Sequence, residues 1–259
     1  MNIINIVNNK ISNSNLNDKI KLIEQENICI DIIDNTKLYI EIDGNNIKNN
    51  IDININKNIN SRIFVFSNLV DSKINININQ YENSNLMLNS FYKNNDVKEN
   101  TIINLNGSNS NIEYNYSCIG ESNKKLRINH YFDKTNSIVK NRSVSNGEEI
   151  EFEITEYVPK KSIDCNLSQS SKIINLKDNK CKIKPILLID EKEVNASHSS
   201  VISPINENDL LYLMSRGIDE QNSINLLVNG FLVNNLNLNE EEKHILFEKY
   251  IFRRWNKWI

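Results

Sequence analysis

The chain has no CxxC pair, and its four cysteines, Cys29, Cys118, Cys165 and Cys181, are widely separated in 259 residues. This spacing argues against a zinc knuckle and gives little support to a disulfide framework. No apolar run approaches the roughly 18 residues that a membrane span needs, and the start lacks the basic and apolar regions of a signal peptide. We therefore expect no membrane insertion and a cytoplasmic location, or an organelle stroma if the chain is organellar.

The chain also has no large excess of either positive or negative charge. The formal net charge is −3, and no basic stripe stands out that could hold nucleic acid. The sequence contains no GxxxxGK[ST], GxGxxG, GxSxG or HExxH motif, so nucleotide-binding and common hydrolase signatures are absent. His130, His198 and His244 are too scattered for a recognisable metal triad. We predict a protein that is not an enzyme and has no catalytic residues.

Asparagine makes up about a fifth of the chain, and it alternates in register with isoleucine. In "IDININKNIN" every isoleucine falls on one side, and "KINININQ" repeats the pattern. Such alternation is the signature of a strand with one buried and one wet face. The same period continues to about residue 167, with polar turn signals such as "DGNN", "NGSNS" and "SNGEE" between the strands.

Many short strands at near-regular intervals fit a sandwich, a barrel or a β-solenoid. Outward asparagine and inward isoleucine favour the solenoid, because stacked coils accept ladders of identical residues. No convincing helical period precedes about residue 205, which makes a βαβ fold improbable. The pattern alone leaves the choice among the three all-β architectures open.

The chain changes character at Ser203-Pro204, which divides it into a predicted β region, 1–204, and a helical region, 205–259. A first helix through "ENDLLYLMSR" has Asn206 or Asn208 as its N-cap and Gly217 as its left-handed stop. A second helix is expected to end near Gly230. A third is expected to start around Asn239, where "EEE" suits the positive helix N-terminus, and to run into "RRWNKWI".

Several residues that could bind metal have a simpler structural interpretation. His130 shares the strand phase of its apolar neighbours and is expected to be a buried, hydrogen-bonded histidine. Cys118, Cys165 and Cys181 are also in phase with apolar neighbours and are expected in the core. Taken alone, His198 too would more often be a buried structural histidine than a ligand.

The segment from Lys184 to Phe231 resembles the core of the SufB/SufD family of iron–sulfur cluster assembly proteins. The residues that carry the resemblance are Pro185, Val194, Ser197-His198, Asp209-Leu210-Leu211-Tyr212-Leu213, Ser215-Arg216-Gly217-Ile218 and Asn229-Gly230-Phe231. Upstream, the family's H-x4-T-x-S and R-x-V…G elements are matched by His130, Thr135, Ser137, Arg142 and Gly147. The similarity covers roughly residues 105–235, and the first hundred residues match only in strand-rich character.

This resemblance implies a right-handed parallel β-helix with a small helical C-terminal region. It implies a dimer, either with a SufB-like paralogue or with a second copy, and docking of a SufC-like ABC ATPase on region 205–259. A nascent Fe–S cluster would form transiently near the interface of the two β-helices, and no tightly bound cofactor is expected. The residues expected to contact a partner are Leu211, Tyr212, Met214, Arg216, Gly217 and Phe231.

Within the family the chain is most similar to the SufD branch. Ser170 stands where the SufB branch has a cysteine, and Ser199 where it has a glutamate, so two strong ligands are missing. His198, which the SufD branch contributes to the interface, is retained and is the candidate iron or cluster ligand. The SufD-type cysteine two residues earlier is Ala196 here.

Three functions remain in competition. The first is a non-catalytic scaffold subunit of a SUF complex. The second is a minimal homodimer that holds the nascent cluster itself, using His198 and Cys181. The third is a ligand-binding or carbohydrate-active β-solenoid, which would require a row of acidic or aromatic residues on one outer face, where the sequence has mostly asparagine and lysine.

Overall fold

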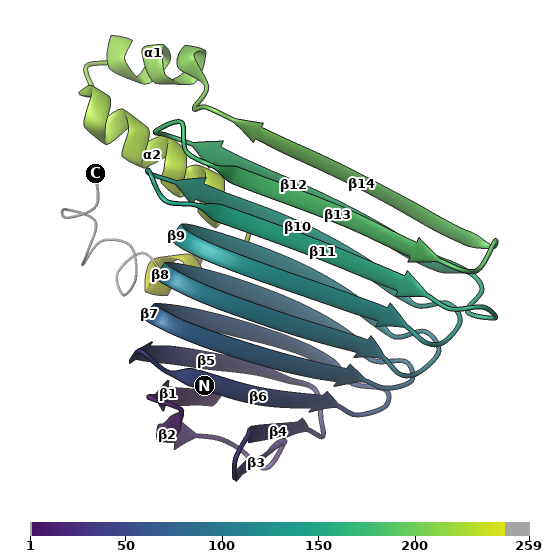
Figure 1. Ribbon diagram of the computed structural model, residues 1–259. Helices are drawn as coiled ribbons and strands as arrows, with labels where there is room; N and C mark the ends of the chain where they lie inside the picture. The colour runs from purple at the N-terminus through teal and green to yellow at the C-terminus, as the bar shows by residue number, and fades with distance from the viewer. Residues whose placement is uncertain (1, 247–259) are drawn as a thin grey trace.

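The computed structural model describes residues 2–246 and shows a β-solenoid of about seven turns with three short helices after it (Figure 1). The strands are β1 (Asn2–Val7), β2 (Lys10–Asn15), β3 (Ile20–Glu24), β4 (Ile28–Ile32), β5 (Thr36–Asn45), β6 (Lys48–Ile55), β7 (Asn60–Gln80), β8 (Asn85–Leu105), β9 (Asn111–His130), β10 (Asn136–Ser145), β11 (Ile150–Val158), β12 (Cys165–Asn175), β13 (Cys181–Ile189) and β14 (Val194–Ser203). The helices are α1 (Glu207–Ser215), α2 (Glu220–Val233) and α3 (Glu240–Leu246). The predicted parallel β-helix with a helical C-terminal region is confirmed.

Each turn of the solenoid contributes to two facing sheets. The first sheet runs from β1 through β5, the first halves of β7, β8 and β9, and then β10, β12 and β14. The second runs from β4 through β6, the second halves of the same three long strands, and then β11 and β13. β7, β8 and β9 therefore bend around a corner and belong to both sheets, which the alternation pattern by itself does not reveal.

Isoleucine forms columns inside the solenoid because the strands are in register from turn to turn. Ile53 pairs with Ile78, Ile78 with Ile103 and Ile103 with Ile128, and all four are at most 1% exposed. Equivalent residues lie about 25 positions apart, as in the Asn75–Asn50 side-chain pair. This 25-residue period is visible in the sequence and would have separated a solenoid from a sandwich or barrel.

The corners of the solenoid explain how the fold forms with only six glycines. Among the described residues, twelve non-glycine residues have positive φ, and ten of the twelve are asparagine or aspartate. At one corner Asn46, Asp71 and Asp96 occupy this conformation with φ of 54°, 45° and 49°, one turn apart. Asparagine and aspartate tolerate the left-handed region better than other side chains, so they replace glycine here.

A second role of asparagine is to connect the turns on the outside. The Nδ2 atoms of Asn85, Asn111, Asn166 and Asn195 each donate to the Oδ1 atom of the asparagine one turn below, at 2.6, 2.7, 2.7 and 3.0 Å. Asn136 makes the same contact with Asn111. Stacked identical amides satisfy one another in this way, which is why the composition is compatible with an ordered fold.

The two ends of the solenoid differ. At the N-terminal end, β2 pairs antiparallel with β1 and β3 pairs antiparallel with β4, so the direction of stacking is reversed and the core is covered. Ile11, Leu16 and Leu22 pack against the buried isoleucines there. At the other end, β14 pairs with β12 and β13 pairs with β11, and no described strand lies beyond them.

The helices begin largely as the sequence predicts. Asn206 caps α1 by accepting from the Asn208 backbone N–H at 3.0 Å, and Gly217 has φ of 87° just after the helix. The expectation that the second helix ends near Gly230 is wrong, because α2 continues to Val233. Tertiary packing sets the end of α2, because its last turn buries Leu232 and Val233. The predicted continuation of the third helix into "RRWNKWI" lies outside the described residues.

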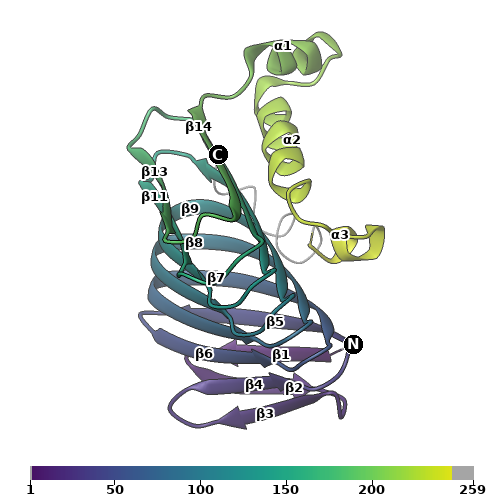
Figure 2. The ribbon, with the colours of Figure 1, turned by 90° about the vertical axis from the view of Figure 1, so that its right-hand side faces the viewer.

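α2 covers part of one face of the solenoid (Figure 2). Its Val228, Leu232 and Val233 are at most 3% exposed and form one cluster with solenoid residues. The solenoid members of this cluster are Tyr39, Phe64, Phe66, Phe91, Val144 and Ile174. The described part of the helical region, residues 205–246, thus shares a core with the solenoid, and removing it would expose a large apolar surface.

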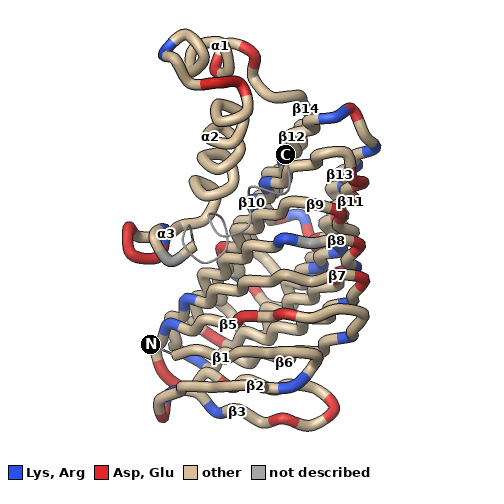
Figure 3. The backbone as a smooth tube through the Cα atoms, turned by 90° about the vertical axis from the view of Figure 1, so that its left-hand side faces the viewer, with Lys and Arg blue, Asp and Glu red and all other residues tan. Residues whose placement is uncertain are grey.

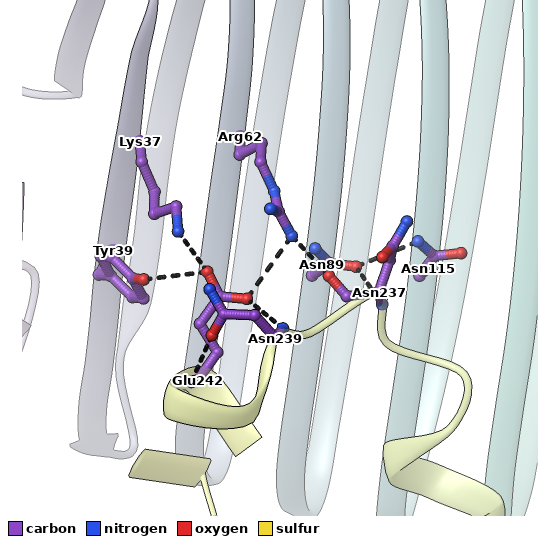
Figure 4. Close-up of polar contacts among 8 residues, drawn as sticks. All are labelled: Lys37, Tyr39, Arg62, Asn89, Asn115, Asn237, Asn239 and Glu242. Carbon is purple, nitrogen blue, oxygen red and sulfur yellow. Dashed lines mark hydrogen bonds and ion pairs between the residues drawn. The ribbon is translucent and has the colours of Figure 1, made fainter. Parts of the chain in front are cut away.

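The segment after α2 is fastened to the solenoid by a buried carboxylate, that of Glu242 in α3 (Figure 4). Lys37 donates to Glu242 Oε1 at 2.5 Å, and Arg62 lies 3.5 Å from Oε2. Tyr39 donates to the same carboxylate at 3.4 Å. Asn239 and Glu242 also cap α3 reciprocally, with each backbone N–H donating to the other's side chain at 2.8 and 2.9 Å. We call these contacts the clasp.

The contribution of the clasp to the unfolding free energy should be measurable. Burial tends to raise the pKa of Glu242, but the hydrogen bond from Lys37, the Asn239 N–H and the Arg62 charge outweigh it, so the pKa is lowered. Glu242→Gln should therefore cost about 1–3 kcal/mol of unfolding free energy above pH 5, and the difference should shrink as the pH falls below about 4.5. Urea unfolding tests this. Glu240→Gln, at a side chain 90% exposed, is the control and should change stability little.

Candidate functional site at the open end of the solenoid

The last turn of the solenoid leaves apolar and polar groups exposed together. Leu188 on β13 and Val201 and Ile202 on β14 are 44%, 49% and 44% exposed. Almost every residue of β14 is exposed, whereas the strand beneath it, β12, alternates between buried and exposed residues. β14 also presents the free hydrogen-bonding edge of a parallel sheet, which is a template for pairing with another chain.

His198 lies in the middle of this open strand. In the register it stands above Gln169, which stands above Val139, and both of these residues point into the core. Its position therefore belongs to an inner column, as its phase with Val194 and Ala196 predicts. The side chain is nevertheless exposed, because no described turn covers it. The interpretation of His198 as a buried structural histidine is thus wrong.

The two serines at the positions of missing ligands are neighbours. Ser170 on β12 pairs with Ser199 on β14, and both have the opposite side-chain phase to His198. The Arg142 guanidinium approaches the Ser170 carbonyl and hydroxyl oxygens at 3.4 Å. The site therefore offers hydroxyl groups on the outer side and a single imidazole on the inner side.

Cys181 is not placed to complete a metal site with His198. It is the first residue of β13, paired with Ile150 on the second sheet, while His198 lies on the first. The expectation that it is a core residue is wrong, because it is half-buried on an uncovered strand. Burial raises the pKa of its thiol, which keeps it protonated. Within residues 2–246, no group of three or more His, Cys, Asp or Glu could hold a metal ion.

Beneath His198 a chain of polar side chains runs through the core. His130 Nε2 lies 3.1 Å from Ser137 Oγ, and Ser137 donates to Glu156 Oε1 at 2.5 Å. Gln169 Nε2 donates to Glu156 Oε2 at 3.0 Å. The other nitrogen of His130 lies 2.8 Å from Thr135 Oγ1. The prediction of a buried, hydrogen-bonded His130 is confirmed, and the H-x4-T-x-S element is one network.

Burial shifts the pKa values of two residues in this hydrogen-bonded network in opposite directions. It lowers the pKa of His130 to about 4. It raises the pKa of Glu156 to about 7, although the hydrogen bonds from Ser137 and Gln169 favour the charged form. Sequence reasoning missed Glu156 and Gln169. The signal was available, because Glu156 lies between apolar residues in "ITEYV", one turn above the inward Ile128.

α1 presents a second exposed apolar surface, away from the solenoid. Leu211, Tyr212 and Met214 are 61%, 58% and 39% exposed, and α1 buries none of its residues. Arg216 lies over the Tyr212 ring at 5.2 Å. α1 contacts α2 and its Leu210 and Leu213 are half-buried, whereas the three exposed side chains could contact a partner.

Phe231 differs from the other residues expected to contact a partner. It is half-buried and packs against the cluster beneath α2. Arg142 and Lys172 lie over its ring at 6.0 and 5.8 Å. Its place in the structure is accounted for by the contact between α2 and the solenoid, and a direct role in partner binding remains a prediction.

The outer groove along the asparagine ladder does not resemble a glycosidase cleft. It has a volume of about 720 Å³, and its charged residues are Lys37, Arg62 and Glu113, with asparagine on every turn. Charges of both signs are mixed along the solenoid (Figure 3). None of the described helices is long and apolar enough to cross a membrane.

Comparison with known proteins agrees with these features. The family model described as SUF system FeS cluster assembly, SufBD core domain, matches residues 9–231. The chain is also 35% identical over 85 residues to the iron-sulfur cluster assembly protein SufD of Bacillus subtilis (strain 168). That alignment covers 31% of this chain and 20% of the relative, so it spans about a fifth of the relative's length.

Proposed function

Because the chain belongs to the SufBD core family of SUF-system iron–sulfur cluster assembly proteins, we propose that it is a non-catalytic scaffold subunit of a SUF complex. In this role it pairs with a SufB-like subunit through the open end of the solenoid. It docks a SufC-like ABC ATPase through the exposed surface of α1.

The observation that carries the proposal is the uncovered final turn. One end of the solenoid is closed by antiparallel strands, while the other exposes Leu188, Val201 and Ile202 beside a free strand edge. An exposed parallel edge with apolar side chains is what β-augmentation requires. A subunit with a similar open end would cover these groups and satisfy the free backbone of β14.

His198 is the residue that this pairing would place between the subunits. A neutral imidazole can bind iron through one nitrogen, and a nascent cluster is then cargo that both subunits hold. Ser170 and Ser199 are poor iron ligands, so stronger ligands would come from the partner. This division of ligands favours a heterodimer over a homodimer that holds the cluster by itself.

Two single substitutions test the two surfaces separately. Leu211→Glu should weaken binding of the SufC-type ATPase about tenfold or more, and Val201→Glu should do the same for the SufB-type subunit. The proteins of the same genome would be co-expressed and the complexes separated by gel filtration, with affinities from titration of labelled protein. Substitution is preferable to truncation because α2 covers the solenoid core.

Ile23→Glu is the matched control, since Ile23 is 47% exposed at the closed end of the solenoid and should affect neither interaction. If wild-type protein bound neither partner and instead formed a dimer sensitive to Val201→Glu, the homodimer would replace the heterodimer. If all three variants behaved alike, neither surface would be an interface.

A further inference from the structure

Two apolar columns inside the solenoid are interrupted by polar residues near the open end. The first is the isoleucine column, which continues through Ile103 and Ile128 and then reaches Glu156. Glu156 is fully buried, and no lysine or arginine among the described residues pairs with it. A carboxyl group at an isoleucine position weakens the core, so its presence calls for a reason other than packing.

The second column interrupted near the open end is the one that leads to His198. It contains Leu88, Tyr114 and Val139, and then Gln169 and His198 in its last two turns. Gln169 is 2% exposed. Its Oε1 atom has no hydrogen-bond partner among the described residues. A buried amide oxygen without a donor is costly, and here the next residue in the column carries an imidazole N–H.

The contact with Glu156 fixes which way the Gln169 amide faces. Gln169 Nε2 donates to Glu156 Oε2 at 3.0 Å. Exchanging the two amide atoms would bring Oε1 against a carboxylate that already accepts from Ser137, so the observed orientation is favoured. The acceptor Oε1 is therefore left free in the turn directly below His198.

From this geometry we propose that Gln169 is a positioning residue for His198, and that Glu156 holds Gln169 in place. The imidazole donates one N–H to Gln169 Oε1, and the second ring nitrogen is left as the lone pair that binds iron. In the structure His198 is exposed and does not make this contact, but neighbouring strands in a sheet lie about 4.8 Å apart, so the proposal needs only a rotation of the His198 side chain toward the residue paired with it. Histidine ligands of metals usually carry such a second hydrogen bond, which fixes the tautomer.

This inference rests on the proposed role of His198 in cluster assembly, and it adds a requirement that the role alone does not have. The proposal requires that the hydrogen bond form in solution without metal, once the exposed His198 side chain has rotated toward Gln169, because Gln169 and Glu156 belong to the chain itself. The orientation of His198 would then be set before a partner or iron arrives, and its binding would cost less ordering of the side chain.

The test is the tautomer of His198, measured by nitrogen-15 NMR of histidine-labelled full-length protein at pH 8 without metal. Wild-type protein should show a single neutral tautomer for His198, and Gln169→Leu a mixture. Gln169→Asn, whose shorter amide cannot reach, should behave like Gln169→Leu while keeping polarity. Gln80→Leu is the matched control, because Gln80 is also buried with an unpartnered Oε1 but lies far from His198. His198→Gln assigns the signal.

A second readout is the affinity for Co(II), a spectroscopic substitute for iron. The dissociation constant should rise about 10–100-fold in Gln169→Leu and stay unchanged in Gln80→Leu. A wild-type tautomer ratio equal to that of Gln169→Leu would overturn the positioning role. A Gln169-dependent tautomer without cobalt binding at His198 would support positioning and contradict the metal role, so the two ideas can fail separately.

Discussion

Replacing Glu99 with glutamine should lower the free energy of unfolding by about 3–5 kcal/mol, the largest effect expected of a conservative substitution in this chain. Glu99 and Lys124 form an ion pair inside the solenoid, with side chains 0% and 1% exposed. The ammonium also donates to Tyr114 at 2.8 Å and lies 4.2 Å from the centre of the Tyr116 ring. Without the carboxylate, a charged lysine would be buried among tyrosines.

Within residues 2–246, Glu99 is the only carboxylate paired with Lys124, and the charge of Lys124 depends on it. Burial lowers the pKa of Lys124, and the charge and hydrogen bond of Glu99 oppose the shift. Loss of Glu99 would therefore force Lys124 to give up its proton or the solenoid to open. Urea unfolding at neutral pH measures the loss, and the reciprocal Lys124→Met should be similarly harmful because it leaves Glu99 unpaired.

The double variant Glu99→Leu with Lys124→Met separates pairing from packing. Replacing both charges by apolar groups should recover most of the lost stability. Glu151→Gln is the control, since Glu151 contacts Lys184 at 2.5 Å but both side chains are about one-third exposed, and it should cost less than about 1 kcal/mol. A Glu99→Gln variant as stable as the control would contradict the prediction.

Glu156→Gln should have an effect that depends on pH. The pKa of Glu156 is about 7 in the folded protein against an ordinary value of 4.5. A raised carboxyl pKa contributes stability below pH 4.5 that is lost as the pH rises through 7. Wild-type protein should therefore lose about 2.5 kcal/mol relative to the variant between pH 5 and pH 8. His130 is neutral across this range, because its pKa is about 4.

Unfolding curves at the two pH values give this difference directly. Any constant cost of the substitution, such as a weaker contact with Gln169, cancels between them. Glu240→Gln, at an exposed carboxylate, should show the same difference from wild type at both pH values. If the Glu156→Gln difference were also independent of pH, Glu156 would be ionised with an ordinary pKa, and the account of its burial would be incorrect.

The local sequence pattern was sufficient to predict which isoleucines point into the core. It also indicated the change from strands to helices at Ser203. These features follow from alternation and capping, which involve neighbours in sequence. The end of α2 was misjudged because Gly230 looks like a stop, whereas burial of Leu232 and Val233 extends the helix. Tertiary packing overrides a local signal in this case.

The candidate site likewise combines features that the sequence predicts with features that depend on tertiary contacts. His198 and the Arg216-Gly217 helix end were predicted from residues and resemblance, and the exposure of His198 follows because no described turn of the solenoid lies beyond β14. Other contacts join residues far apart in sequence. The buried pair Glu99–Lys124 spans 25 positions, and the contact of Lys37 with Glu242 in the clasp spans 205. Lys124 does share the inward phase of Leu126 and Ile128, but a lysine in that phase predicts nothing until its partner is known.

The difference between the two ends of the solenoid bears on how many solenoids can join end to end. Repeating structures that have an unpaired strand edge at both ends can polymerise, as stacked β-strands do in fibrils. This chain closes its first turn with antiparallel strands and leaves its last turn open. In the language of polymer chemistry the solenoid would be monofunctional in the proposed pairing of open ends, because that pairing would use the one end that lacks an antiparallel cap among the described residues.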